Sequence, residues 1–180
     1  VYLAPDAEQL DVVDHSTGEA GTGAERRNVL RESARLARGV VSPLQDVPAI
    51  DLDALVIPGG MGAAKNLSVP TPEGLGFGVL RPDVASLVAA LAARRAPVAT
   101  IGLAAAVLAR HEGRPLESVP VGMPANEATA DEERRTLFTP GFMGSDDVAL
   151  VAEGIERLTE RLASWLGVHP ALAVPKGAPR

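Results

Sequence analysis

Short apolar runs alternate along this chain with longer segments in which apolar residues recur at helical spacing. The runs are rich in Val, Leu and Ile, and most of them end at Pro or Gly. Such runs are typical of strands buried on both faces of a parallel sheet, and their alternation with helices predicts an α/β fold. The predicted strands are residues 54–57, 98–101 and 136–139, with shorter candidates at 1–3 and 40–41.

Three intervening segments are predicted to be amphipathic helices. The first covers residues 24–38 and turns Arg31, Arg35 and Arg38 outward, as a solvated face or, alternatively, as an anion site. Its inward positions are Val29, Leu30, Ser33, Leu36 and Ala37. The second helix has Asp83 as its N-cap and ends at residues 94–95, and its apolar stripe is Val84, Leu87, Val88 and Leu91. The third opens at residues 145–147, and its stripe is Val148, Val151, Ile155, Leu158, Leu162 and Trp165.

Composition limits the domain organisation and the partners. With 180 residues, of which 46% are hydrophobic, the chain can bury one substantial core, and we assign one domain to residues 1–167. Residues 168–180 are Pro-rich with little periodicity and are predicted to form a surface tail. A net charge of −6 and an aromatic content of 3% argue against nucleic acid as a partner. Small molecules or proteins are better candidates.

The sequence also argues against membrane, disulfide and metal chemistry. It has no run of eighteen apolar residues and no basic segment followed by a long apolar stretch at the N-terminus, so we expect a cytoplasmic protein. It contains no cysteine, which excludes disulfides and zinc–thiolate sites. Its three histidines, His15, His111 and His169, show no metal-ligand spacing, and no metal is predicted.

Two turns that follow predicted strands could carry chemistry, because ligands of open α/β sheets bind outside the carboxyl ends of the strands. In residues 58–65, Pro-Gly-Gly-Met-Gly-Ala-Ala-Lys, the glycines could expose N–H groups to an anionic oxygen. The spacing fits neither a phosphate-binding P-loop nor a dinucleotide fingerprint. A simple tight connection is the alternative interpretation.

The second turn resembles a nucleophile elbow, in which a strand stops abruptly and the residue at the bend opens a helix. That residue is Gly102, which can adopt a left-handed bend but supplies no nucleophile. The hydroxyl groups expected nearby are those of Ser68, Thr100 and Thr139. A hydroxyl needs more activation than a thiol, and no histidine is placed by a motif to provide it.

Three motifs in order resemble one family. Residues 55–68 (LVIPGGMGAAKNLS), 12–19 (VVDHSTGE) and 27–30 (RNVL) look like the ElbB-type branch of the DJ-one/PfpI superfamily, which are class I glutamine-amidotransferase-like domains. The resemblance implies a flavodoxin-like three-layer sandwich and a cofactor-free, glyoxalase III-like lyase acting on glyoxal or methylglyoxal. Older descriptions link the branch to isoprenoid biosynthesis.

The resemblance also implies roles for individual residues. The N–H groups of Gly60 and Leu103 would stabilise an oxyanion, Gly59 and Asn66 would belong to the same binding site, and Gly102 stands where the family has its catalytic cysteine. Ala105 replaces a family proline, and the segment between residues 110 and 136 is shorter than usual.

The chain begins at what resembles the second strand of the family, without the first strand, first helix and catalytic glutamate. We expect the sheet to close up, another chain to fill the slot, or the sequence to be a piece of a longer one. A homo-oligomer is the predicted state, because unpaired strand edges recruit other chains.

Two functional hypotheses remain, with a third in reserve. The first is an enzyme of the glyoxalase III or amidohydrolase kind, which needs an activated nucleophile. The second is a noncatalytic relative that keeps the pocket and binds a small carbonyl or carboxylate compound, or a protein partner. The third is a fragment without independent function. Both main hypotheses predict that the strands ending at Ile57 and Ile101 are parallel neighbours, so that the turns meet.

Overall fold

The computed structural model describes residues 1–14, 16–20, 26–71 and 78–168, and within them the main sheet has four strands in the order β5-β6-β8-β7. The first three strands of this order are parallel, and β7 pairs antiparallel with β8. Their bounds are Leu55–Ile57 for β5, Val98–Ile101 for β6, Thr136–Thr139 for β8 and Thr129–Asp131 for β7. The mostly parallel sheet confirms the predicted α/β class.

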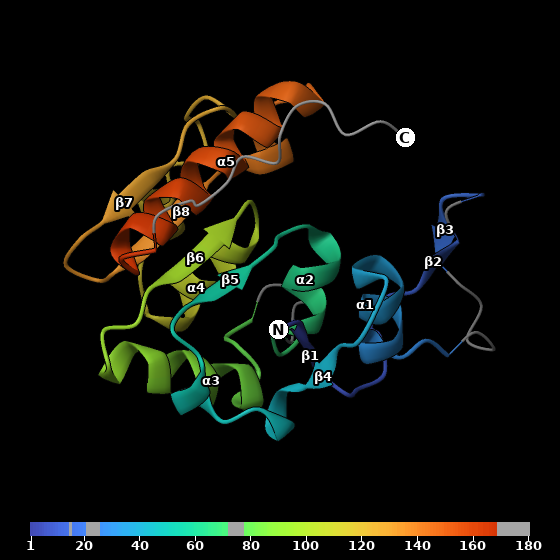
Figure 1. Ribbon diagram of the computed structural model, residues 1–180. Coiled ribbons are helices and arrows are strands. Elements are labelled where there is room, and N and C mark those ends of the chain that lie inside the picture. Colours follow the sequence, from blue (N-terminus) through green and yellow to red (C-terminus); the bar gives the residue numbers. More distant parts are fainter. Residues whose placement is uncertain (15, 21–25, 72–77, 169–180) are drawn as a thin grey trace, which may run out of the picture.

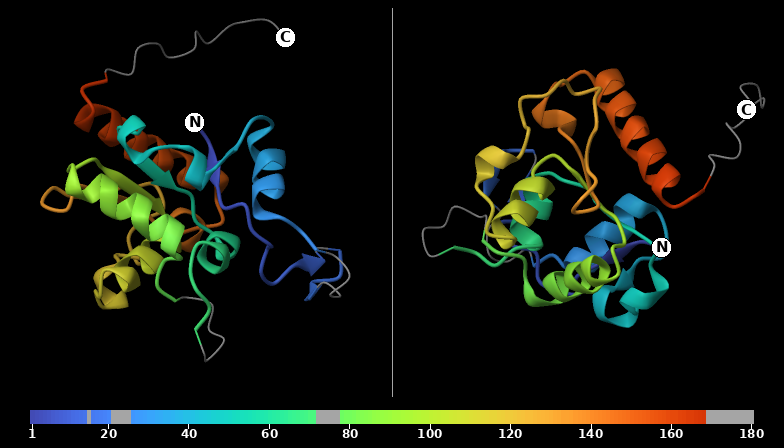
Figure 2. Two further views of the ribbon diagram at one scale, coloured as in Figure 1. Left: turned by 90° about the horizontal axis from the view of Figure 1, so that it is seen from below. Right: turned by 90° about the vertical axis from the view of Figure 1, so that its left-hand side faces the viewer.

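Helices cover both faces of this sheet (Figure 1). Helix α5, Val148–Trp165, packs against β6 and β8 on one face, while α3, Pro82–Ala93, and α4, Ala104–His111, lie on the other. The two views in Figure 2 show the same three layers. Leu137 and Leu158 are fully buried on the α5 side, and Leu91 is fully buried on the opposite side. This layering agrees with the predicted three-layer sandwich.

A second, two-stranded parallel sheet lies beyond α2, Met61–Asn66, and carries α1, Val29–Ala37, beside it (Figure 1). It pairs β1, Leu3–Ala4, with β4, Ser42–Pro43, two residues later than the predicted strands begin. The hairpin of β2, Val13–Asp14, and β3, Glu19–Ala20, which the sequence did not predict, projects away from both sheets. Short 3-10 turns occupy Leu44–Asp46 (η1), Ala49–Asp51 (η2), Leu116–Ser118 (η3) and Gly141–Met143 (η4).

Helix α1 is shorter and less buried than predicted. It begins at Val29 because the Asn28 side chain caps it, accepting a hydrogen bond from the Arg31 N–H at 3.1 Å. Asn28 itself is extended, and the Gln9 N–H donates to the Arg27 carbonyl at 2.8 Å, while residues 24 and 25 of the predicted helix lie outside the described residues. No residue of α1 is buried, and Leu36, predicted to point inward, is 88% exposed. The apolar face of α1 therefore packs only partly in this structure.

Helix α3 begins before the predicted N-cap. Arg81 is the N-cap and Pro82 occupies the first turn, so Asp83 lies inside the helix. The Asp83 carboxylate accepts from the Val84 N–H at 2.9 Å and from Arg81 Nε at 2.7 Å, which explains why it resembled a cap. The predicted stripe is confirmed, since four of its residues are buried: Val84, Leu87, Val88 and Leu91.

Helix α5 begins where the sequence predicted, with Asp147 as N-cap accepting from the Ala149 N–H at 2.8 Å. Val151, Leu158 and Leu162 are buried as expected, but Val148 is 68% exposed because the first turn of α5 extends past the sheet. Trp165 is partly buried, and the Arg135 guanidinium carbon lies 4.2 Å from the centre of its ring.

The predicted tail at residues 168–180 lies outside the described residues except for Val168, so the domain boundary stays a prediction.

Among the helices of the described ranges, none combines the length and the apolar character needed to cross a bilayer.

Candidate functional site

The two predicted turns meet at the carboxyl edge of the sheet. Strands β5 and β6 are parallel neighbours, with Ile57 paired to Thr100, as expected. The backbone of Gly59 lies so close to β6 that a Cβ there would overlap the Ile101 carbonyl oxygen and would lie 3.0 Å from the Leu103 nitrogen. Only glycine allows this contact, which joins the residue 58–62 loop to the start of α4.

Gly102 forms the predicted elbow. Its φ of +58° is left-handed, and its N–H donates to the Thr139 carbonyl at 2.9 Å while its own carbonyl accepts from the Ala105 N–H at 3.1 Å. These two bonds hold the bend from both sides. A Cβ at this position would lie 3.4 Å from the Pro140 oxygen and 3.6 Å from Met143 Sδ, which are ordinary contacts. A side chain at position 102 would therefore be strained by the backbone angle and not by lack of space.

Two backbone N–H groups, those of Gly60 and Leu103, are the donors of the predicted oxyanion site. Gly60, with φ of 127°, is the N-cap of α2, and Leu103 is the N-cap of α4. Within the described ranges, neither N–H donates a hydrogen bond to another residue. Two unused N–H groups from adjacent loops are the arrangement that stabilises a carbonyl or carboxylate oxygen.

A third loop, which sequence reasoning missed, completes the site. Residues 140–144 follow β8, and a Cβ on Gly141 would lie 3.0 Å from Ile101 Cγ2. The signal was present, because Pro140 and Gly141 end a strand parallel to β6 and must therefore reach the same edge. None of the three loops, residues 58–62, 101–104 and 140–144, contains an ionisable side chain.

Each of the three candidate hydroxyl groups donates a hydrogen bond to a main-chain carbonyl. Ser68 Oγ donates to the Ala64 carbonyl at 2.6 Å, Thr100 Oγ1 to the Leu137 carbonyl at 3.2 Å and Thr139 Oγ1 to the Glu127 carbonyl at 2.9 Å. All three side chains are buried. Each hydroxyl is therefore directed at a backbone oxygen instead of a ligand.

The Asn66 amide braces the backbone around α2. It is 8% exposed; its Oδ1 accepts from the Leu10 N–H at 2.8 Å and its Nδ2 donates to the Gly62 carbonyl at 2.8 Å. The neighbouring Lys65 forms an ion pair with Asp11 at 2.8 Å, which ties the same segment to α2. In this geometry Asn66 supports the loop, and its assignment to ligand binding stays a prediction.

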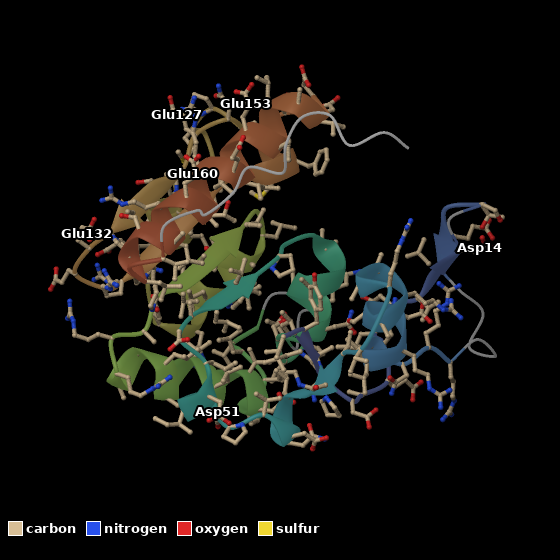
Figure 3. The ribbon with its side chains drawn as sticks, viewed as in Figure 1. Asp14, Asp51, Glu127, Glu132, Glu153 and Glu160 are labelled. Atoms are coloured by element: carbon tan, nitrogen blue, oxygen red, sulfur yellow. The ribbon has the colours of Figure 1, made fainter. Side chains whose placement is uncertain are left out.

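The titrating groups with perturbed pKa values lie away from the elbow. The Arg134 N–H and guanidinium donate to Asp131 and lower the pKa of its carboxyl, and Ser16 does the same for Asp14. The carboxylates labelled in Figure 3 lie on the periphery: Asp14 on the β2–β3 hairpin, Asp51 in η2, Glu127 and Glu132 on either side of β7, and Glu153 and Glu160 on α5. Across the described part of the chain, no group of three His, Asp or Glu side chains could hold a metal ion.

Distinct hollows lie elsewhere on the surface. One of about 460 Å³ is lined by charged residues of α1 and its approach, including Arg27, Arg31 and Arg35. Another, of about 190 Å³, lies between α4 and the β7–β8 pair and includes Thr100 and Arg114. At the elbow itself, Gly59 and Gly60 are exposed, Leu103 is half-buried and Gly102 is buried, so the surface beside the bend consists mainly of backbone groups.

Comparisons with known proteins agree with this architecture. The human mitochondrial glutamine amidotransferase-like class 1 domain-containing protein 3 is 50% identical over 72 residues, which are 40% of this chain and only 26% of the human protein. The rat mitochondrial ES1 protein homolog is 29% identical over 190 aligned residues, covering 92% of this chain and 71% of the rat protein. No family model matches the chain.

A solved structure resembles the whole fold. The isoprenoid biosynthesis protein with an amidotransferase-like domain from Ehrlichia chaffeensis superposes with a TM-score of 0.77 and 27% identity. The match covers 91% of this chain and 82% of that chain.

We predict that Gly102→Cys places a reactive thiol at the elbow. The substitution should lower the free energy of unfolding by about 1 to 2 kcal/mol, because a side chain is forced to a positive φ. The thiol should react with iodoacetamide faster than that of Arg157→Cys on the exposed side of α5, because the N-terminus of a helix favours the thiolate. Equal or slower alkylation of Gly102→Cys in the folded protein would contradict the elbow assignment.

Proposed function

This chain belongs to the class I glutamine-amidotransferase-like domains of the DJ-one/PfpI superfamily, and from that premise we propose that it binds small carbonyl or carboxylate compounds without transforming them. The observation that carries the proposal is the pair of unused N–H groups on Gly60 and Leu103, set beside a bend that has no side chain. Such donors bind an oxygen that carries partial or full negative charge.

Catalysis requires an atom that forms a bond with the substrate. At the elbow this atom would come from residue 102, which is glycine, or from a hydroxyl group. The hydroxyls of Ser68, Thr100 and Thr139 already donate to main-chain carbonyls. The three loops also contain no acid or base that could move a proton. We therefore propose that the glyoxalase III-like activity implied by the resemblance does not occur in this chain.

The proposed location is the cytoplasm, as the sequence predicts. The human and rat relatives are named as mitochondrial proteins, which is a different compartment from the one proposed here.

Binding is tested by following the backbone amides of a ¹⁵N-labelled sample while acetate is added at constant ionic strength. We expect the Gly60 and Leu103 resonances to shift with a millimolar Kd, which corresponds to about 4 kcal/mol, because the site is open. Gly113 and Gly167, in turns that do not contact the elbow, serve as internal controls. The proposal fails if acetate leaves Gly60 and Leu103 unchanged, or moves the control resonances equally.

The same sample tests catalysis. With methylglyoxal as substrate, the rate of hydroxy-acid formation should equal that of buffer, because oxyanion stabilisation alone supplies no bond-forming atom. Turnover above buffer that survives Ser68→Ala and Thr100→Ala would show that the chain is an enzyme with a mechanism other than the one excluded above.

We also propose that the chain self-associates through strand edges. Leu55 donates its N–H toward β6, to the Pro97 carbonyl at 3.0 Å, so the N–H and C=O of Val56 face the opposite edge. Among the described residues, β5 pairs only with β6 and β1 only with β4, which leaves an outer edge on each strand. The Val56 side chain is 40% exposed, and no residue of α1 is buried.

Light scattering across a hundredfold range of protein concentration should therefore show a concentration-dependent rise in mass. Val56→Lys should reduce this association, because a lysine on an edge strand opposes pairing with another chain. Val148→Lys, at an apolar position on α5 that is 68% exposed against 40% for Val56, is the control and should leave the mass unchanged. A monomer at every concentration would mean that the two strand edges are not used.

A further inference from the structure

A hollow beside helix α1 gathers four arginine side chains. It measures about 460 Å³, and its charged lining consists of Arg26, Arg27, Arg31, Arg35, Glu8 and Glu32. Four guanidinium groups against two carboxylates leave a local charge of +2, in a chain whose net charge is −6. Arg38, which the sequence placed in the same row, does not line the hollow. The other arginines of the row therefore border a concave, positively charged surface, which favours the anion site over a solvated face.

Main-chain contacts between two segments build this hollow. Glu8 pairs with Asn28 in an antiparallel bridge, and the Gln9 N–H donates to the Arg27 carbonyl at 2.8 Å. Asn28 is also the N-cap of α1. The backbone on both sides of the hollow is therefore fixed by hydrogen bonds, and the arrangement of the arginines does not rest on their long side chains alone.

The two carboxylates leave much of the positive charge without a partner. Glu8 lies 3.8 Å from Arg26, a long contact for an ion pair, and Glu32 lies 3.3 Å from Arg35. The Arg31 side chain makes no ion pair or hydrogen bond with another residue that the structure describes. Arg31 also lies in the first turn of α1, where the helix dipole opposes a cation, and one turn before Arg35. An anion in the hollow would relieve this repulsion.

The composition of the lining indicates which class of anion fits. Among the described residues, none that lines this hollow is aromatic or aliphatic, and its uncharged member is Asn28. Single-stranded nucleic acids are bound with stacking rings, membrane surfaces with apolar anchors, and protein partners through interface cores that are depleted of charge. The volume lies within the range of small-molecule sites. A small, polar anion fits this lining better than any of the three larger partners.

We propose that the hollow beside α1 binds small phosphate monoesters. A phosphate monoester carries close to two negative charges at neutral pH, which matches the local charge of +2, whereas a carboxylate or a sulfate ester carries one. The planar guanidinium of Arg31 donates paired hydrogen bonds to the phosphate oxygens, and Arg27 and Arg35 add positive charge beside it. No residue of the three elbow loops lines the hollow, so this second site does not depend on the binding function proposed above.

The proposal is tested by calorimetric titration of the full chain with phenyl phosphate and with phenyl sulfate, at constant ionic strength. The two probes share one body and differ in charge. Phenyl phosphate should bind at least about tenfold more tightly, because its second charge and extra acceptor oxygen are used by the arginines. Arg31→Gln should weaken phenyl phosphate binding by about tenfold or more. Arg38→Gln removes the same charge from the end of the same helix, outside the hollow, and should bind like the wild type.

Thermal unfolding separates loss of the site from damage to the fold. Without ligand, Arg31→Gln should melt at or above the wild-type Tm, because a cation leaves the arginine row and the first turn of α1. With phenyl phosphate, the wild-type Tm should rise above that of Arg31→Gln, because the ligand binds the folded state. A purely structural role of Arg31 would not produce this reversal.

Four results would overturn the proposal. The first is equal affinity for phenyl phosphate and phenyl sulfate, or no binding of either. The second is unchanged phenyl phosphate affinity in Arg31→Gln. The third is sedimentation with vesicles of phosphatidylcholine and phosphatidic acid without binding of phenyl phosphate, which would assign the arginines to a membrane surface. The fourth is an increase in mass that Arg31→Gln abolishes, again without binding of phenyl phosphate, which would assign them to a second copy of this acidic chain.

Discussion

The close approach of two backbones at the carboxyl edge of the sheet is the constraint on which the site depends. Gly59 lies against the residues between Ile101 and Leu103 at a separation that a Cβ would make impossible. The parallel register of β5 and β6 brings the loops that follow these strands to the same edge of the sheet, and Gly59 lets their backbones touch. As a result, Gly59 and Leu103, which are distant in sequence, lie close together at this edge.

The elbow keeps its backbone geometry without a side chain at the bend. Gly102 adopts a left-handed bend at little cost, since glycine has no Cβ to oppose a positive φ, and hydrogen bonds to β8 and α4 hold the bend. The nearby hydroxyls are bonded to main-chain carbonyls, so the remaining recognition groups are backbone amides. These amides favour binding over bond formation, and they belong to loops that the sheet positions.

The sequence predicted the parts of this structure in which local pattern and burial agree. Strands β6 and β8 have the predicted bounds, and the buried stripe of α3 is confirmed, because these elements are enclosed by the core. The prediction that Leu36 points inward was wrong, because α1 rests on a two-stranded sheet that is too small to cover its apolar face. The contact between the turns after β5 and β6 could be predicted, because parallel neighbouring strands end at the same edge of the sheet. The residue 140–144 loop and the bracing role of Asn66 depend on contacts between distant segments, which a single sequence does not display.

The most direct test of this account is the stability of Gly59→Ala compared with Gly62→Ala, measured by urea denaturation. Both glycines lie in the same loop region, but a Cβ on Gly62 meets no atom within 4 Å, whereas one on Gly59 would overlap the Ile101 carbonyl. The account predicts that Gly59→Ala lowers the free energy of unfolding by about 3 kcal/mol or more, since backbone must move to admit the methyl group. Gly62→Ala, inside α2, should be neutral or stabilising by up to about 1 kcal/mol. Equal stabilities for the two variants would contradict the close contact and with it the shared site.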